Sequence, residues 1–358
     1  MVMTQEAPAP ADAAAVAQVR VVGVGGGGVN AILRMRGAAV PGVQFLCINT
    51  DANSLERAKD MACIRIGDNL TRGLGAGGNP EVGFKAAAET KESLVNALHG
   101  ADLVFLTAGM GGGTGTGAAP LVAEIARNAG ALCVAVVTTP FSFEGARRMA
   151  TATAGLQALK GKVDTLIVIG NDRLLATSPQ KMAVQEAFRM ADQVVMQAIL
   201  AVSRVINVPG DINVDFADVK AIMQDAGSGI MAIGHGQGEH RTLDAARFAI
   251  ANPLLDTTID GAKGVLFTVA GGADLTLAEV NAAGQLIAET VDPDAQIFFG
   301  MSIDQTPKRA NQVEITLIAT KLPERTQAHN TPGFVPARLG GDGASSDVEM
   351  PAFLRSHR

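Results

Sequence analysis

Short apolar runs alternate with helical patterns along the first half of the chain. Runs with the length and composition of buried strands occur at 18–24, 43–49, 102–107, 131–137 and 165–169. Apolar residues at helical spacing predict helices between them at 30–36, at 81–98 after Pro80, and from the end of a glycine-rich stretch to about residue 128. This alternation predicts a parallel sheet with helices on both faces.

The longest helical pattern covers 184–206, where apolar side chains recur at i, i+3, i+4 and i+7. A helix of about 25 residues would be about 40 Å long, enough to run through one domain and connect it to another. The pair Pro209-Gly210 is expected to end this helix. Beyond it, a smaller α+β unit is predicted, with strands at 229–234, 265–270, 296–301 and 313–319 and helices at 242–251 and 275–289.

These patterns predict an α/β fold, in which a Rossmann-like parallel-sheet domain is joined by the long central helix to a smaller α+β domain. The two ends of the chain are polar or rich in Pro, Gly and Ser without periodicity, so both are expected to be disordered tails. The predicted segments are an N-terminal arm (1–17), the parallel-sheet domain (18–182), the central helix (183–209), the second domain (210–320), a flexible linker (321–345) and a short terminal peptide (346–358).

Composition narrows the function classes. Of the 358 residues, 47% are hydrophobic and 18% are charged, which excludes global disorder. The net charge of −6 gives no basic surplus for nucleic acid or for an anionic membrane surface. No apolar run approaches the roughly 18 residues that would span a bilayer, so direct membrane insertion is not expected. The three cysteines form no disulfide framework, and a reducing cytoplasm fits them.

The glycines cluster, and the first cluster lies between a predicted strand and a predicted helix. Gly23, Gly25 and Gly28 satisfy the pattern G-x-G-x-x-G. Glycine lets backbone N–H groups approach an anion, and a following helix N-terminus favours negative charge. Together with Asp51 after the second strand, this is an NAD-type fingerprint of modest specificity. The alternative is a tight strand–helix turn, but four consecutive glycines would cost much conformational entropy on folding for a turn alone.

A second cluster, Gly-Met-Gly-Gly-Gly-Thr-Gly-Thr-Gly at 109–117, follows the third strand and opens another helix. It offers a second set of N–H groups and two hydroxyl donors. Two such loops at one sheet edge suit a nucleoside triphosphate better than a dinucleotide, and no G-x-x-x-x-G-K-[ST] motif is present. The stretch 73–78 adds a third glycine loop, which either closes over the terminal phosphate or is a simple connection.

Several motifs in a fixed order carry a resemblance to a known family. They are GGGTGTG at 111–117, GGGGVN at 25–30, NTD at 49–51, PFSFEG at 140–145, NDRL at 171–174 and NVDFAD at 213–218. With these motifs the chain resembles the tubulin/FtsZ family of GTPases over about 18–320, and again in the terminal motif. Two features depart from the family pattern: Gly170 stands where the family usually has proline, and the linker is short.

The resemblance implies a guanine nucleotide and assigns residues to each of its parts. Phosphate binding is implied for one group of residues: Gly26, Gly27, Gly28, Val29, Asn30, Gly113, Thr114 and Gly115. Glu144 is placed on the ribose hydroxyls and Arg148 near ribose and phosphate. The residues alone favour a surface i,i+4 ion pair for these two.

The base is assigned to Asn171, Phe188 and Asp192. A carboxylate at Asp192 can accept from both N1–H and N2–H₂ of guanine, whereas adenine N1 is itself an acceptor. Phe188 would stack on the base, and a plain core role on the apolar stripe is its alternative.

Two acids follow the long helix at its end far from the glycine loops. In the family, subunits stack head to tail, and Asp215 and Asp218 are placed at the γ-phosphate of the neighbour's GTP to position the attacking water, with Asn213 holding their loop. An interface of this kind does not close and gives a filament. Without the resemblance, helix N-capping is the preferred role for these acids, since Asp218 opens a predicted helix.

The function that the resemblance implies is a cell-division GTPase. It would polymerise into protofilaments of the division ring at mid-cell in the cytoplasm, and it would use GTP/GDP, Mg²⁺ and, as an open question, a monovalent cation. The motif from Asp347 to Arg355 would dock on membrane-tethering adaptors, and other division regulators are expected. An incidental apolar tail is the alternative for this motif. His235 and His240 are expected in a loop, not in a metal site.

Two other functions remain open. An NAD-dependent oxidoreductase would use the first glycine cluster and Asp51 but leaves the second cluster, the two acids and the tail unexplained. A scaffold that binds GTP and assembles without much hydrolysis is less consistent with the presence of both Asp215 and Asp218.

Overall fold

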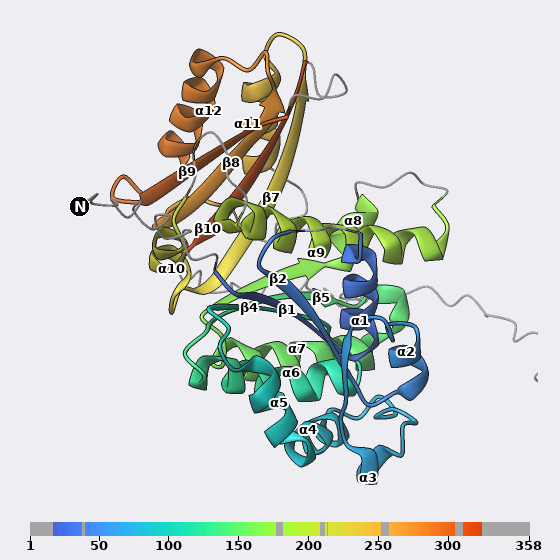
Figure 1. Cartoon of the computed structure of the whole chain (residues 1–358). Coiled ribbons are helices and arrows are strands. Elements are labelled where there is room, and N and C mark those ends of the chain that lie inside the picture. The colour runs from blue at the N-terminus through green and yellow to red at the C-terminus, as the bar shows by residue number, and fades with distance from the viewer. Residues whose placement is uncertain are drawn as a thin grey trace, which may run out of the picture. The chain divides into compact units, whose positions relative to one another are not determined.

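The computed structural model describes residues 17–37, 40–176, 182–207, 212, 214–251, 258–304 and 311–323. Within these residues, ten strands form one sheet in the order β3-β2-β1-β4-β5-β6-β7-β10-β8-β9 (Figure 1). The seven strands from β3 to β7 in this order are parallel to one another, β10 is antiparallel to β7 and β8, and β8 and β9 are again parallel. The fold is therefore mixed α/β, as predicted.

The elements of the first part of the chain alternate between strand and helix. They are β1(Val19–Val24), α1(Gly25–Met35), β2(Val43–Asn49), α2(Ala52–Glu56), β3(Ala62–Arg65), α3(Asp68–Thr71), α4(Pro80–Glu89), α5(Lys91–Leu98), β4(Leu103–Gly109), α6(Thr114–Asn128), β5(Leu132–Thr139), η1(Ser142–Glu144), α7(Ala146–Lys160), β6(Thr165–Gly170), α8(Asn171–Ala176) and α9(Val184–Asn207).

The second part begins after α9. It contains α10(Phe216–Met223), β7(Gly227–Gln237), α11(Arg241–Ile250), β8(Gly264–Gly272), α12(Leu277–Thr290), β9(Gln296–Asp304) and β10(Gln312–Thr320). Here β7 pairs with β6 through three residue pairs, from Thr165↔Gly227 to Ile167↔Gly229, and continues into the antiparallel pairing with β10. The sheet thus continues from one predicted domain into the other, and the domain boundaries themselves stay predictions.

Helices cover both faces of the parallel strands. One core cluster combines the central strands with α4, α5, α6 and α7, and the other combines them with α1, α9 and α10. Figure 1 shows α6 and α7 on one side of β4, β1 and β5 and the long α9 on the other. Being covered on both faces explains why β4 is an almost continuous apolar run, with six of its seven residues buried. A third cluster packs α11 and α12 on the second part of the sheet.

Two predicted helices and one edge strand differ from the sequence prediction. Helix α1 begins at Gly25, five residues before the predicted start at 30. The prediction missed this first turn because its four glycines have low helix propensity. The predicted helix 81–98 is two helices that meet at Thr90, whose hydroxyl accepts from Gly67 N–H and donates to Ala86 C=O. The short strand β3 at the sheet edge was not predicted at all.

The glycine-rich stretch around His235 is strand, not the loop that the sequence suggests. Gly234 and Gly236 belong to β7 because α11 packs directly on their backbone: a Cβ at these positions would lie 1.9 Å from Ala245 O and 1.7 Å from Arg241 O. His235 is paired with Glu314 of β10. His240 is the N-cap residue of α11.

Long α9 has the predicted extent as far as it is described, and its 24 residues correspond to about 36 Å. The predicted stop at Pro209-Gly210, most of the N-terminal arm, the linker from 324 onward and the terminal peptide lie outside the described residues. Among the helices that the structure describes, none is both long and apolar enough to cross a membrane.

Candidate nucleotide site

Two helices begin side by side at the carboxyl edge of the sheet. Strands β1 and β4 are parallel neighbours with Val24 opposite Ala108, so α1 and α6 start next to each other. The N–H groups of a helix's first turn have no acceptor within the helix, and they add to the positive end of the helix dipole. Both starts therefore direct unpaired N–H groups toward the same space, a favourable place for an anion.

Glycine makes this close approach possible. A Cβ at Gly25, whose φ is +72°, would lie 2.7 Å from the nitrogen of Gly115, and one at Gly27 would lie 3.0 Å from the nitrogen of Gly109. The two glycine clusters are thus packed backbone against backbone. Any larger residue at Gly25 would separate the two helix starts, which explains the glycines better than a lone turn does.

The space between the two helix starts is the mouth of a cavity of about 350 Å³. This volume lies in the range of small-molecule sites. Eleven of the thirteen residues predicted to bind the nucleotide line the cavity: Gly26, Gly27, Asn30, Gly113, Thr114, Gly115, Glu144, Arg148, Asn171, Phe188 and Asp192.

The other two predicted residues, Gly28 and Val29, are buried beneath the cavity. Val29 is fully buried in the core, and a Cβ on Gly28 would lie 2.4 Å from Thr107 O. Since α1 starts at Gly25, the amide of Gly28 is the first that pairs within the helix, with Val24 C=O. These two residues therefore support the first loop from below, and Gly26 and Gly27 present the exposed amides.

The two hydroxyls of the second cluster have different roles. Thr116 Oγ1 accepts from Gly111 N–H at 2.9 Å and is buried, so it fixes the loop, and Thr116 is not among the described residues that line the cavity. Thr114 lines the cavity, and its Oγ1 lies 2.7 Å from Oγ1 of Thr50 at the end of β2. Of the two predicted donors, only Thr114 faces the cavity.

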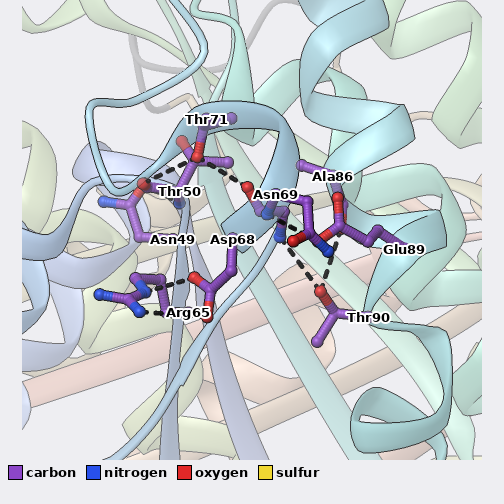
Figure 2. A network of polar contacts seen from close by, with 10 residues as sticks. Asn49, Thr50, Arg65, Asp68, Asn69, Thr71, Ala86, Glu89 and Thr90 are labelled. Carbon is purple, nitrogen blue, oxygen red and sulfur yellow. Dashed lines mark hydrogen bonds and ion pairs between the residues drawn. The ribbon is translucent and has the colours of Figure 1, made fainter.

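A polar network holds α3, which directly precedes the third glycine loop at 73–78 (Figure 2). Thr71 Oγ1 donates to Gly67 O at 3.0 Å and contacts Thr50 O, while the Asn69 amide and side chain both donate to Glu89 of α4. Arg65 and Asp68 form an ion pair on the same segment. The loop that follows is fixed at its base, and the side chain of Leu74 at its start is 86% exposed.

Asp51 does not take the position of a ribose-binding carboxylate. Its Oδ1 accepts from Asn53 N–H at 3.0 Å and caps α2, and its backbone pairs with Leu74 of the third loop. Asp51 is not among the described residues that line the cavity. The dinucleotide alternative thus loses its acidic residue.

At the base end of the cavity, Asp192 of α9 pairs with Arg34 of α1. Arg34 Nε donates to Asp192 Oδ2 at 2.7 Å. Burial raises the pKa of the Asp192 carboxyl above its ordinary value, and the arginine opposes that shift. Sequence reasoning missed Arg34. The signal available was its position four residues after Asn30, which places both on one face of α1.

Asn171 and Phe188 line the cavity together with Asp192. The carboxamide oxygen of Asn171 is buried and has no hydrogen-bond partner among the described residues, which fits a donor supplied by a bound base. Phe188 is 39% exposed and packs edge-to-face on the buried Phe141, with ring centroids 5.2 Å apart. Its ring is therefore neither fully core nor fully free, and the exposed part borders the cavity.

Glu144 and Arg148 form the ion pair that the residues alone suggest, with Arg148 Nη1 2.8 Å from Glu144 Oε2. The Glu144 side chain is nearly buried, and its Oε1 accepts from Phe141 N–H at 2.8 Å. Both residues also line the cavity. The ion pair and a position beside a ligand are therefore compatible.

The two acids after α9 are remote from the cavity. Asp215 is exposed at the N-cap position of α10, and Asp218 is half-buried in the first turn; neither is among the described residues that line the cavity. From Asp192 to the end of α9 the helix rises about 22 Å. Asn213 lies outside the described residues.

The capping alternative for these acids needs correction. Helix α10 begins at Phe216, so the cap position belongs to Asp215 and not to Asp218. Within the described residues, the Asp215 carboxylate makes no capping hydrogen bond. Asp215 therefore has an exposed carboxylate that local structure does not use.

Comparisons with known proteins find matches over both parts of the chain. Residues 18–179 match the GTPase domain of the tubulin/FtsZ family, and residues 227–323 match the C-terminal domain of the FtsZ family. A solved FtsZ dimer from M. jannaschii is 46% identical, with a TM-score of 0.80 over 85% of this chain and 88% of that chain. A single-substitution variant of that FtsZ gives 46% identity and a TM-score of 0.81, over 85% of this chain and 91% of that one. The GTPγS-bound protofilament of CetZ2 from Haloferax volcanii shares the fold at 20% identity, with a TM-score of 0.71 over 86% and 95% of the two chains.

Proposed function

This chain belongs to the tubulin/FtsZ family and is a GTPase, and from that premise we propose that it polymerises head to tail and completes its hydrolytic site between subunits. The proposed role is that of the cytoskeletal protein of the division ring, in the cytoplasm at mid-cell. GTP would favour assembly, and its hydrolysis at the interface would weaken the filament.

The single observation that carries the proposal is the separation of the binding cavity from Asp215 and Asp218. The cavity is lined by backbone amides, by the Thr114 hydroxyl and by side chains that would contact the base. Its two acids, Glu144 and Asp192, are both held in ion pairs. An unpaired carboxylate able to orient a water is present at the other end of α9, on the exposed start of α10. One subunit therefore holds the nucleotide and a second would supply the acids.

In the bound state, each group would act on a different part of GTP. The amides of Gly26, Gly27 and Gly113–Gly115 would receive the phosphates. Asp192 would accept from the N1–H and N2–H₂ edge of guanine, and the unpaired Asn171 oxygen would accept a further donor from the base. Glu144 would accept from the ribose hydroxyls while Arg148 holds its other oxygen.

The hydrolytic step would join two subunits. Asp215 and Asp218 of one subunit would orient a water in line with the γ-phosphate of the next, and a carboxylate would accept the proton as the oxygen–phosphorus bond forms and GDP leaves. Mg²⁺ would neutralise phosphate charge. The described residues contain no group of three or more acidic, His or Cys side chains suited to a metal, so the ion would be held mainly by the phosphates.

The dimer and protofilament states of the solved relatives support assembly of this kind. We further propose that the terminal peptide from Asp347 to Arg355, outside the described residues, docks on membrane-tethering adaptors through its apolar anchors.

The rate of GTP hydrolysis as a function of protein concentration tests the proposal, with Mg²⁺ present and ATP as the control nucleotide. The expected result is no turnover below a threshold concentration and a steep rise above it, with no ATP turnover. A rate proportional to protein from the lowest concentrations would mean that each subunit holds a complete site, and the role of Asp215 and Asp218 would be wrong.

A further inference from the structure

Helix α10, which carries the two acids at its start, is fixed at its other end by side chains from distant parts of the chain. The last four C=O groups of a helix have no partner within it. In α10 all four are bonded: Lys220 O to Gln224 N, Ala221 O to Lys321 Nζ, Ile222 O to Thr320 Oγ1 and Met223 O to Thr165 Oγ1, at 2.6 to 2.9 Å. Thr165 and Thr320 are fully buried, so water cannot replace their hydroxyls.

The residue after this helix end adds an ionic contact. Asp225 has φ +49°, a left-handed conformation that is unfavourable for a residue other than glycine. Its N–H donates to Asp164 Oδ1 at 3.3 Å, and its Oδ1 accepts from Arg127 Nη2 at 2.7 Å. Asp164 is buried, accepts from Cys133 N–H and lies 3.3 Å from the same guanidinium nitrogen. Arg127 thus connects the end of α10 to Asp164, the residue before β6, which in turn bonds to β5.

Arg127 also relates α10 to the nucleotide cavity. It lies in the last turn of α6, and the first turn of α6 supplies Thr114 and Gly115 to the cavity. One rigid helix therefore has one end at the predicted phosphate position and the other against the helix of the acids.

We propose that Arg127 and Asp225 are positioning residues for hydrolysis: they fix α10 and so hold Asp215 and Asp218 where the neighbouring subunit's GTP meets them. This inference rests on the proposed function. The eight residues of α10 span about 12 Å, so a rotation of about 10° at the anchored end moves the acids by about 2 Å. A misplacement of about 1 Å can lower a rate about a hundredfold.

If Arg127 and Asp225 only stabilised the fold, their replacement would lower turnover only as far as it lowers stability. The side chains of Arg127 and Asp225 are 34% and 68% exposed, and exposed ion pairs contribute little to stability. Arg127 also lies beside the buried Asp164, so the Asp225 variants are the ones that separate positioning from stability. Replacing Asp225 by glycine removes the ion pair but also relieves the left-handed backbone.

The test compares Asp225→Gly, Asp225→Asn, Arg127→Gln and Arg127→Lys with the natural chain. Lys162→Gln is the matched control, because Lys162 pairs with Glu124 on the same helix α6 but is not part of the α10 anchor. The measurements are turnover per assembled subunit, the assembled fraction, GTP affinity below the assembly threshold, and Tm.

We expect turnover per assembled subunit to fall about tenfold or more in Asp225→Gly, Asp225→Asn and Arg127→Gln, with partial recovery in Arg127→Lys. GTP affinity and assembled fraction should stay within about twofold, and the Tm of Asp225→Gly should not fall. Natural turnover per assembled subunit in Asp225→Asn and Arg127→Gln would overturn the inference, as would losses that follow Tm across the set. Absence of a concentration threshold in the natural chain would instead overturn the proposed function.

Discussion

Arg34 Nε donates to Asp192 Oδ2 at 2.7 Å and so joins α1 to α9, two helices that both line the cavity. This contact uses one lone pair of Asp192 Oδ2 and leaves acceptor sites on both oxygens for the two adjacent donors of guanine. The arginine also opposes the effect of burial on the Asp192 pKa. Arg34 therefore tunes the residue that is proposed to select the base.

The first prediction concerns pH. The Asp192 pKa is raised by burial, and bound guanine requires the ionised carboxylate, so GTP affinity should fall as pH falls toward that raised pKa. In Arg34→Met the opposing cation is lost, the pKa rises further, and the loss of affinity should begin at a higher pH. Equilibrium binding of GTP between about pH 5 and pH 8 measures both curves. Identical pH profiles for the two proteins would contradict the coupling.

The second prediction concerns base selection. Asp192→Asn keeps the shape but replaces one acceptor by an NH₂ donor that opposes the guanine edge, so GTP affinity should fall about tenfold to a hundredfold. Inosine triphosphate lacks the N2 amino group, so the preference for GTP over this analogue should also shrink. Competition binding with both nucleotides gives the two constants. An unchanged preference would place the base away from Asp192.

The third prediction separates binding from hydrolysis. Asp215 is exposed and remote from the cavity, so Asp215→Ala should bind GTP like the natural chain, lose turnover and form over-stable filaments. Nucleotide binding, phosphate release and filament lifetime are measured on the same preparation. Loss of GTP binding in this variant would be inconsistent with activation by a neighbour.

The fourth prediction concerns the second glycine cluster. Thr116→Val removes the acceptor of the buried Gly111 N–H, which should lower the free energy of unfolding by about 1–3 kcal/mol and weaken GTP binding. Thr116→Ser keeps the hydroxyl and serves as the control. Denaturant unfolding and GTP affinity are measured for both variants. Equal behaviour of the valine and serine variants would show that this hydrogen bond does not hold the loop.

The fifth prediction concerns the terminal peptide. Deleting residues 349–358 should leave GTP turnover unchanged and abolish adaptor binding, since the described residues that line the cavity all lie between Gly26 and Asp192. Turnover and co-sedimentation with an adaptor measure the two properties. A large loss of turnover would mean that the tail is not a separate module.

Much of the sheet could be predicted because its strands are buried on both faces. The run 43–49 was predicted with the bounds that β2 has, and the remaining predicted strands differ by a few residues at their ends. The misses have local causes. Strand β3 has four residues and no alternation, and the break at Thr90 depends on a hydrogen bond from Gly67, which no pattern along the chain records.

The cavity was predicted in large part because its residues lie in ordered motifs, yet its pairing partners were not. Arg34 and Asp192 are 158 positions apart, and neither residue alone indicates the other. The anchor of α10 is hidden in the same way, since Thr165, Thr320 and Lys321 reach it from 58 to 100 positions away. Sequence patterns report faces and turns, whereas contacts of this kind appear only when distant segments are brought together.

The three residue pairs that join β6 to β7 have a mechanical consequence. A filament under tension would transmit load through each subunit from the glycine-rich end to the acid-bearing end, and part of that load would cross this short seam. Backbone hydrogen bonds resist shear together but break one by one when peeled, and three pairs offer little of either resistance. The load would be shared with the core cluster that joins α9 and α10 to β6, β8 and β10, so Gly227–Gly229 is where the sheet itself is least continuous.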